Sequence, residues 1–270
     1  MSTPIVGRAA ETEALLACIA AGRHVLLEGP VGVGKTALAR AVCATLDRPM
    51  VRVDGDGRFT ESKLVGLFDP PAVLSQGYRP ECFLGGPLVQ AMRLGGVLFV
   101  NELNRMPEGV QNVLLPALDE GRIFVPNLGE VSAAPGFALV ATQNPAEFVA
   151  TGALSEALLD RFELVRLDYQ SEAEERDIVA QDARCSPGAD TIERAVALVR
   201  ATRADARIRR GASVRAAIAV ADIAARLGGD VGRAARLALP TRIELVDPTA
   251  TPIAALLDDL AKKARVVDPR

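Results

Sequence analysis

The amino-acid sequence predicts an α/β domain built on a parallel sheet, followed by a small all-α domain. Two observations carry this prediction. Short apolar runs alternate with helix-like segments up to Asp168, a pattern typical of a parallel sheet covered by helices on both faces. Beyond Asp168 strand-like runs nearly vanish, and Ala- and Arg-rich segments with helical spacing follow. We therefore place a domain boundary near Tyr169, with residues 1–169 in the first domain and 170–270 in the second.

In the first domain, apolar runs too short for helices predict the strands of the sheet. These runs are residues 24–28, 50–54, 97–100, 137–143 and 164–168. Apolar side chains at helical spacing, or an Ala- and Leu-rich composition, predict the helices between them. These helices cover residues 9–21, 36–46, 108–120 and a segment beginning at Ser155. Residues 55–87 are punctuated by Gly and Pro, and residues 123–134 predict a hairpin around the turn-like NLGE.

The first helix of the second domain is predicted to begin after Ser171. Glu174 stands three residues further on, which is the spacing of a capping box, where each side chain bonds the other residue's backbone N–H. The apolar periodicity predicts four helices in this domain. They cover residues 172–184, 190–203, 213–227 and 252–264.

The amino-acid composition argues against several classes of function. The 31 basic and 34 acidic side chains give a net charge of −3, so no overall positive field favours nucleic acid or anionic lipid, and we do not expect nucleic-acid binding. No apolar run approaches the ~20 residues that a membrane span needs, so we do not expect membrane insertion. Four cysteines without CxxC spacing and a single histidine do not favour a zinc or disulfide framework. The amino-terminal residues lack the basic and apolar regions of a signal peptide. We expect a soluble, cytoplasmic protein.

The segment GPVGVGKT follows the strand 24–28 and matches the pattern G-x-x-x-x-G-K-[ST]. Its glycines let the backbone turn its N–H groups toward phosphate oxygens, and the following helix adds the positive end of its dipole. Lys35 would reach the terminal phosphates, and the Thr36 hydroxyl would ligate Mg²⁺. The sequence therefore predicts a P-loop that binds ATP with Mg²⁺. Its residues are Gly29, Pro30, Val31, Gly32, Val33, Gly34, Lys35 and Thr36.

Polar residues also follow two other predicted strands. Asn101 and Glu102 come directly after the apolar VLFV, and Asn144 follows the strand 137–143. Ligands of doubly wound sheets lie at the carboxyl ends of the strands, so Glu102 is a candidate general base and Asn144 could hold the attacking water. The alternatives are a helix cap for Glu102 and an Asn-Pro turn for Asn144.

Arginines matter because a guanidinium can neutralise the charge that spreads during phosphoryl transfer. Arg161 lies in LLDRF after the sheet strands, and Arg215 lies at the start of a helix in the second domain. Residue type alone does not separate such a role from that of a solvated surface arginine.

Together these segments resemble the MoxR-like branch of the AAA+ ATPases over nearly the whole chain. IVGR (5–8) resembles the adenine-side motif, and GPVGVGKT the Walker A motif. The segment from VLFVNELNR to GRI resembles Walker B with its following helix, and ATQNP resembles sensor 1. GALSEALLDRF resembles the segment bearing the arginine finger, GASVRAAI the sensor 2 segment, and ALPTRIEL the carboxyl-terminal signature.

The resemblance implies an AAA+ core followed by a helical lid. It places Ile5 and Val6 beside the adenine, makes Glu102 the catalytic base and Asn144 sensor 1, and implies that Arg161 acts on the neighbouring subunit's ATP and Arg215 on its own. Residues 63–88 match the position of the family's helix-2 insertion and 122–136 that of its presensor-1 hairpin. These elements face the pore or the client in relatives, although two plain surface loops remain the alternative.

The chain departs from the family at Asn101, where an Asp would normally hold Mg²⁺. Asn keeps a carbonyl acceptor at this metal-side position but loses the negative charge, so metal affinity should fall. Because Glu102 persists, we favour an active or slowed ATPase. On the sequence alone, Asn101→Asp is expected to tighten the Mg²⁺ dependence and to raise or preserve turnover.

Three functions compete. The first is a ring ATPase, a hexamer in this interpretation, that remodels, matures or activates a protein client with a von Willebrand factor A domain partner. The second is a nucleotide-gated assembly module in which Asn101 keeps hydrolysis negligible. The third, a DNA-directed motor, rests on the basic run RATRADARIRR (200–210), but aromatic stacking residues are scarce, with ten Phe and Tyr together and no Trp.

Overall fold

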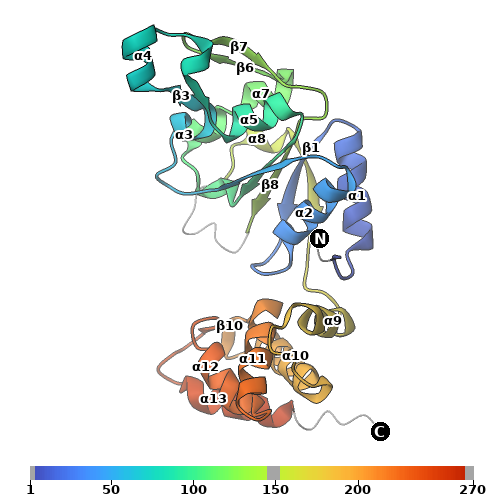
Figure 1. Cartoon of the computed structure of the whole chain (residues 1–270). Helices are drawn as coiled ribbons and strands as arrows, with labels where there is room; N and C mark the ends of the chain where they lie inside the picture. Colours follow the sequence, from blue (N-terminus) through green and yellow to red (C-terminus); the bar gives the residue numbers. More distant parts are fainter. Residues whose placement is uncertain (1–3, 145–152, 265–270) are drawn as a thin grey trace. The chain divides into compact units, whose positions relative to one another are not determined.

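The computed structural model describes residues 4–144 and 153–264, and the chain divides into two compact units (Figure 1). The first unit comprises Met1–Pro30 and Gly34–Asp168, and the second comprises Tyr169–Arg270 together with Val31–Val33. Each unit has its own cluster of buried apolar side chains. Each therefore has the hydrophobic core that a compact domain needs.

The first unit is built on a five-stranded sheet in the order β2-β5-β8-β1-β9, in which every pairing of neighbours is parallel. The strands are β1 His24–Glu28, β2 Met50–Asp54, β5 Val97–Asn101, β8 Ala138–Gln143 and β9 Phe162–Arg166. The predicted α/β fold with a parallel sheet is confirmed. The last strand begins and ends two residues earlier than predicted, because the preceding helix α8 is only one turn, Glu156–Leu159.

Helices flank this sheet. They are α1 Ala9–Ala20, α2 Lys35–Thr45, α5 Pro87–Leu94, α6 Glu108–Asn112 and α7 Leu115–Glu120. The single helix predicted over 108–120 is wrong, since it is divided into α6 and α7. Pro116 stands in the first turn of α7 and has no N–H to donate to the carbonyl four residues earlier, so a continuous helix would lose that bond.

The Gly- and Pro-rich residues 55–87 contain more regular structure than their composition suggests. They form α3 Glu61–Val65, β3 Gly66–Phe68, α4 Pro70–Gln76, a 3₁₀ turn Pro80–Cys82 and β4 Phe83–Gly85. β3 and β4 pair antiparallel. The hairpin predicted over residues 123–134 is present as β6 Arg122–Val125 with β7 Gly129–Ser132.

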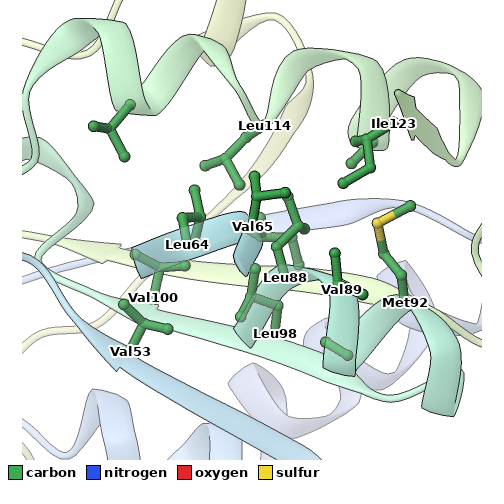
Figure 2. Packing of buried hydrophobic residues seen from close by; sticks show 14 of the residues in the cluster. Val53, Leu64, Val65, Leu88, Val89, Met92, Leu98, Val100, Leu114 and Ile123 are labelled. Carbon is green, nitrogen blue, oxygen red and sulfur yellow. The ribbon is translucent and has the colours of Figure 1, made fainter. Parts of the chain in front are cut away.

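One hydrophobic cluster joins these added elements to the sheet (Figure 2). Alternate residues of a strand point to opposite faces, and on this face Leu98 and Val100 of β5 meet Leu64 of α3 and Leu88 of α5, all fully buried. Val97 and Phe99 are also fully buried on the opposite face. Both faces of the sheet are therefore covered, as a parallel sheet requires.

The second unit is helical, with two additions to the prediction. Its helices are α9 Glu172–Asp182, α10 Ala189–Ala204, α11 Val214–Arg226, α12 Val231–Ala238 and α13 Ile253–Lys263. The capping box of Ser171 and Glu174 is confirmed. Helix α12 was not predicted, nor was the small antiparallel pair β10 Ile208–Arg210 with β11 Glu244–Leu245. Among the helices of the described residues, none combines the length and apolar character needed to span a bilayer.

Candidate active site

The glycine-rich loop lies between the carboxyl end of β1 and the first turn of α2. Gly34 is the N-cap residue of α2 with φ +95°, and Gly32 has φ +82°. Residues with a Cβ adopt such angles rarely. The loop therefore requires glycine at these positions, and the free N–H groups that begin α2 are available to an anion.

The Lys35 ammonium folds back over this loop. Its Nζ donates to the carbonyl oxygens of Gly29, at 2.5 Å, and Pro30, at 2.9 Å. Thr36, half-buried, follows it in the first turn of α2. This arrangement holds an ammonium and a hydroxyl beside the backbone that would cradle phosphates.

Asn101, Glu102 and Thr142 form a chain of hydrogen bonds across the ends of β5 and β8. The Glu102 N–H donates to Thr142 Oγ1 at 2.8 Å, and the Thr142 hydroxyl donates to Asn101 Oδ1 at 3.1 Å. Thr142 is fully buried, so its hydroxyl is held rather than shared with solvent. The two polar residues predicted at the end of β5 are thereby fixed to the neighbouring strand.

Glu102 adopts a left-handed backbone conformation, with φ 56° and ψ 53°. Such a conformation is costly for a residue with a Cβ. It is found most often at functional sites, where surrounding contacts hold the backbone in place. Its carboxylate pairs with Arg105 at 2.6 Å. The side chain forms no capping hydrogen bond with the 3₁₀ turn that follows, so helix capping does not explain this residue.

Asp54 contacts Asn101 from the other side. It ends β2 directly opposite Asn101 in the parallel pairing, and the Asn101 Nδ2 donates to Asp54 Oδ1 at 3.0 Å. Arg52 also bonds this carboxylate, with a shortest distance of 2.7 Å. The bonds from Arg52 and then Asn101 hold the pKa of Asp54 below its usual value.

Asn144 follows β8 directly and is buried, with 6% of its surface exposed. Its neighbour Gln143 donates from Nε2 to Glu28 Oε2 at 2.8 Å, which ties the end of β8 to the end of β1 just before the glycine loop. The predicted sensor residue therefore stands at the same edge of the sheet as Glu102 and the loop. The Pro145 of the alternative Asn-Pro turn lies outside the described residues.

Arg161 is held within its own chain. Its guanidinium makes two parallel bonds to Asp119 of α7, Nε to Oδ1 at 2.6 Å and Nη2 to Oδ2 at 2.7 Å, and a third to the carbonyl of Ala157. Bidentate pairs of this kind have defined geometry as well as charge. The Arg161 bonds lower the pKa of Asp119, and the same contact raises the pKa of Arg161.

Three predicted site residues remain. Ile5 and Val6 lie near the start of the first unit, and Arg215 lies in the second unit. Ile5 and Val6 are half-buried ahead of α1, next to Arg8, whose guanidinium bonds Glu11 and the carbonyl of Asp168. Arg215 is exposed in the first turn of α11. Because a cation is disfavoured at the positive end of a helix, helix stability does not account for Arg215.

The residues present fit a Mg²⁺ ion bound together with nucleotide phosphates. Mg²⁺ takes hard oxygen ligands and keeps several waters, binding few protein groups beside the phosphates. Thr36 Oγ1 and Asn101 Oδ1 are such oxygens, and the amide oxygen that accepts from Thr142 has a second lone pair. Mg²⁺ at such a site would neutralise phosphate charge.

Four residues of this site were missed in the sequence: Asp54, Arg105, Asp119 and Thr142. Asp54 had a detectable signal, because it ends a predicted strand as Asn101 does. Thr142 lay within the segment ATQNP already selected. Arg105 and Asp119 act as partners of Glu102 and Arg161, and no pattern of spacing distinguishes them from surface charges.

A glycine-rich loop between a parallel strand and a helix, with polar residues at the ends of neighbouring strands, defines a P-loop nucleotide-binding domain of the α/β class. Residues 24–162, just over half of the chain, match the AAA domain family of the dynein-related subfamily. The chain belongs to this family of AAA+ proteins.

Curated relatives cover part of the chain. A protein of Staphylococcus haemolyticus is 34% identical over 164 residues, which are 60% of this chain and 62% of that protein. One from Staphylococcus saprophyticus is 32% identical over 166 residues, 61% of this chain and 62% of its own length. Both are described as uncharacterized proteins. The chain thus spans less than two thirds of the length of these relatives.

Solved structures share the fold. A candidate ATPase from Cytophaga hutchinsonii aligns with a TM-score of 0.53 and 23% identity over 96% of this chain and 90% of its own. The RuvB Holliday junction branch migration motor of Thermotoga maritima aligns with a TM-score of 0.54 and 21% identity, over 86% of this chain and 70% of its own. At these identities the likeness establishes the fold alone.

Proposed function

We propose that this chain is a MoxR-like AAA+ ATPase that binds ATP with Mg²⁺, hydrolyses it in a ring of six subunits and uses the cycle to remodel or activate a protein client. A partner with a von Willebrand factor A domain would supply client contacts. Ile5 and Val6 would contact the adenine, and the loop from Gly29 to Thr36 would hold the phosphates. The observation that carries the proposal is the fixed chain from Glu102 through Thr142 to Asn101 at the sheet edge that holds the loop.

The residues divide the work by chemical type. Glu102 would orient and deprotonate the attacking water, Asn144 would hold that water by hydrogen bonding, and Asn101 with Thr36 would contact Mg²⁺. Two arginines would neutralise charge on the phosphates, Arg215 from the same chain and Arg161 from a neighbour. The bidentate contact of Arg161 with Asp119 holds this guanidinium in one orientation near α8, and the contact would have to be released before Arg161 could reach a neighbour's phosphate.

Phosphate release tests this proposal. The purified chain with ATP and Mg²⁺ should release phosphate well above a Glu102→Gln variant, and the difference should persist or grow when a candidate partner is added. Lys35→Ala should abolish nucleotide binding itself and serves as the control for contaminating ATPases. Equal release by the wild-type chain and Glu102→Gln, with and without partner, would refute hydrolysis by this site.

A second function, a nucleotide-gated assembly module with negligible turnover, has one observation in its favour. The Glu102 carboxylate is engaged by Arg105 at 2.6 Å, which competes with its use as a base. This function requires larger assemblies with ATP than with ADP and an unchanged assembly state in Glu102→Gln. Sedimentation velocity with each nucleotide separates the two functions when it is combined with the phosphate assay.

A DNA-directed motor receives no support from the lid. The arginines of residues 200–210 are each paired with carboxylates: Arg200 and Arg203 with Glu175, Arg207 with Asp205 and Asp259, and Arg209 and Arg210 with Glu244. The Arg207 bonds hold the pKa of the Asp205 carboxyl at about 2. Arginines neutralised in this way would release few counterions on binding DNA, so only a salt-dependent DNA shift would favour this function.

A further inference from the structure

The ends of β2 and β5 are locked together at the metal side of the site. Asp54 and Asn101 are register partners, and the N–H of the next residue, Gly55, donates to the Asn101 carbonyl at 2.7 Å. A Cβ at Gly55 would lie 2.1 Å from the Glu102 carbonyl oxygen. This close approach of two backbones fixes where the Asp54 and Asn101 side chains stand.

Both partners of the Asn101 amide are satisfied by one orientation, and Asp54 requires it. An ionised carboxylate only accepts hydrogen bonds, so the amide must present its NH₂ group to Asp54, as it does at 3.0 Å. The Thr142 hydroxyl accepts the Glu102 N–H and donates its own proton to Asn101 Oδ1 at 3.1 Å, which matches the same orientation. Of these two restraints, only the one from Asp54 carries a full charge.

This orientation sets which atom of Asn101 faces the nucleotide. β5 lies between β2 and β8, and β1, which leads into the glycine loop, lies beyond β8. The NH₂ group faces β2, while the carbonyl oxygen faces β8 and therefore the side on which the loop begins. Mg²⁺ accepts an amide oxygen as a ligand and is repelled by an amide N–H.

Asp54 also explains why an amide, and not an acid, fits at position 101. A carboxylate there would replace the Nδ2 donor with an oxygen about 3 Å from Asp54 Oδ1, and two like charges at that distance repel. The expectation that Asn101→Asp restores an ordinary metal site therefore does not account for the repulsion from Asp54. The change that removes this repulsion is the exchange of both side chains.

We propose that Asp54 is a positioning residue of the proposed ATPase: through its bond to the Asn101 amide it directs the amide oxygen toward the metal, so that Asp54 and Asn101 together replace a Walker B aspartate. The inference rests on the proposed function, since it concerns the same nucleotide site. Arg52, bonded to both carboxylate oxygens of Asp54, keeps this carboxylate in place.

A double-mutant cycle with Mn²⁺ in place of Mg²⁺ tests the inference without relying on turnover. The variants are Asp54→Asn, Asn101→Asp and the exchange Asp54→Asn with Asn101→Asp. Asp56→Asn serves as a matched control, because Asp56 is an exposed carboxylate two residues away that bonds Arg58. The measurements are the Mn²⁺ affinity of the ATP-bound chain, by electron paramagnetic resonance of free Mn²⁺, and the affinity for ATP in excess EDTA.

Asp54→Asn alone should weaken Mn²⁺ binding about tenfold, the effect typical of removing a residue that orients a metal ligand, and should leave the metal-free ATP affinity unchanged. In the Asn101→Asp background the same substitution should not weaken Mn²⁺ binding, because a carboxylate presents an oxygen in either orientation. A purely structural role of Asp54 would give the same loss in both backgrounds. That result, or wild-type Mn²⁺ affinity in Asp54→Asn, would overturn the inference while leaving the proposed function intact, whereas a wild-type chain that binds no ATP would overturn both.

Discussion

Asp119 and Arg161 form a bidentate pair in which both guanidinium-to-carboxylate distances are 2.7 Å or shorter. The pair joins α7, which follows the candidate catalytic segment, to the second residue after α8. This contact holds the Arg161 guanidinium in one orientation within its own chain. The same contact competes with any phosphate that Arg161 is to reach.

We predict that Arg161 acts in trans. Arg161→Ala should lower turnover by about 10³-fold, as expected for loss of an arginine finger, with little change in ATP affinity. Glu102→Gln should also be inactive by itself. A mixture of the two variants should recover activity, because an Arg161→Ala subunit keeps its own Glu102 and can receive Arg161 from a Glu102→Gln neighbour. An inactive mixture that still forms mixed oligomers would show that Arg161 does not act on the neighbouring subunit's ATP.

Release of Arg161 from Asp119 should favour assembly. In Asp119→Asn the Arg161 guanidinium loses its charged partner. Breaking the remaining contact should then cost less free energy when Arg161 binds a neighbour's nucleotide. ATP-dependent oligomers should then form at a lower protein concentration, as measured by sedimentation velocity. Glu120→Gln is the matched control, since the adjacent Glu120 pairs with Arg122 instead. Weaker assembly in Asp119→Asn would mean that the pair holds Arg161 ready for its neighbour.

Thr142 should matter for both stability and turnover. Thr142→Val keeps the shape but leaves the Glu102 N–H without its acceptor, and an unsatisfied buried donor costs about 1–3 kcal/mol. Turnover should fall with it, because the strained Glu102 backbone loses its anchor. Thr142→Ser restores the hydroxyl and should recover both properties in urea unfolding and phosphate release. A valine variant with wild-type turnover would show that Glu102 is held in place by other contacts.

His24, the one histidine of the chain, should make stability depend on pH near neutrality. It is buried at the start of β1, where its Nδ1 accepts from the Leu139 N–H and its Nε2 lies 3.2 Å from the Leu118 carbonyl oxygen, so the ring is held neutral. Burial lowers its pKa, and the nearby charges of Arg23 and Asp119 act in opposite directions.

Because the folded pKa of His24 lies below the unfolded value, the unfolded chain binds the proton first as the pH falls. The stabilisation from neutral His24 is therefore complete above pH ~6.5 and is lost as the pH falls through the folded pKa. The slope for this one group cannot exceed about 1.4 kcal/mol per pH unit. Urea unfolding between pH 5 and 8 should show this slope in the wild-type chain and not in His24→Gln. Equal slopes in the two proteins would mean that carboxylates, and not His24, cause the pH dependence of stability.

The sheet could be predicted from the sequence because each of its strands is a short run of apolar residues next to a turn or helix signal. Helix α5 could not, although Leu88 and Met92 are fully buried. Its eight residues follow two glycines and begin with proline, so composition favours a loop. Packing against α3, β2 and β7, which lie far from it in the sequence, stabilises this helix together with the adjacent β5.

Helix α12 was missed for a similar reason. It is eight residues long and follows Gly228 and Gly229, and its beginning is marked by Asp230, whose side chain accepts from the Arg233 N–H. Helices this short depend on tertiary packing more than on propensity. Four of its residues are buried in the second unit's cluster, among them Ala234 and Ala235.

In the candidate site, the sequence indicated the residues that bear the chemistry but not those that hold them. Glu102, Asn144 and the loop could be found because strand ends and glycine spacing are local patterns. Asp54 and Asp119 lie 47 and 42 residues from the side chains they bond. Such partners depend on strand order and helix placement, which a single sequence does not specify.

At position 102 the left-handed backbone favours glycine for stability, whereas the proposed catalysis requires glutamate. Glycine adopts φ 56° without the Cβ contact that strains other residues, a cost of about 1 kcal/mol. Glu102→Gly should therefore yield a chain more resistant to unfolding than Glu102→Ala, and equally devoid of a base. A screen of variants of this protein for survival on heating alone would therefore favour Glu102→Gly, a substitution that removes the proposed base.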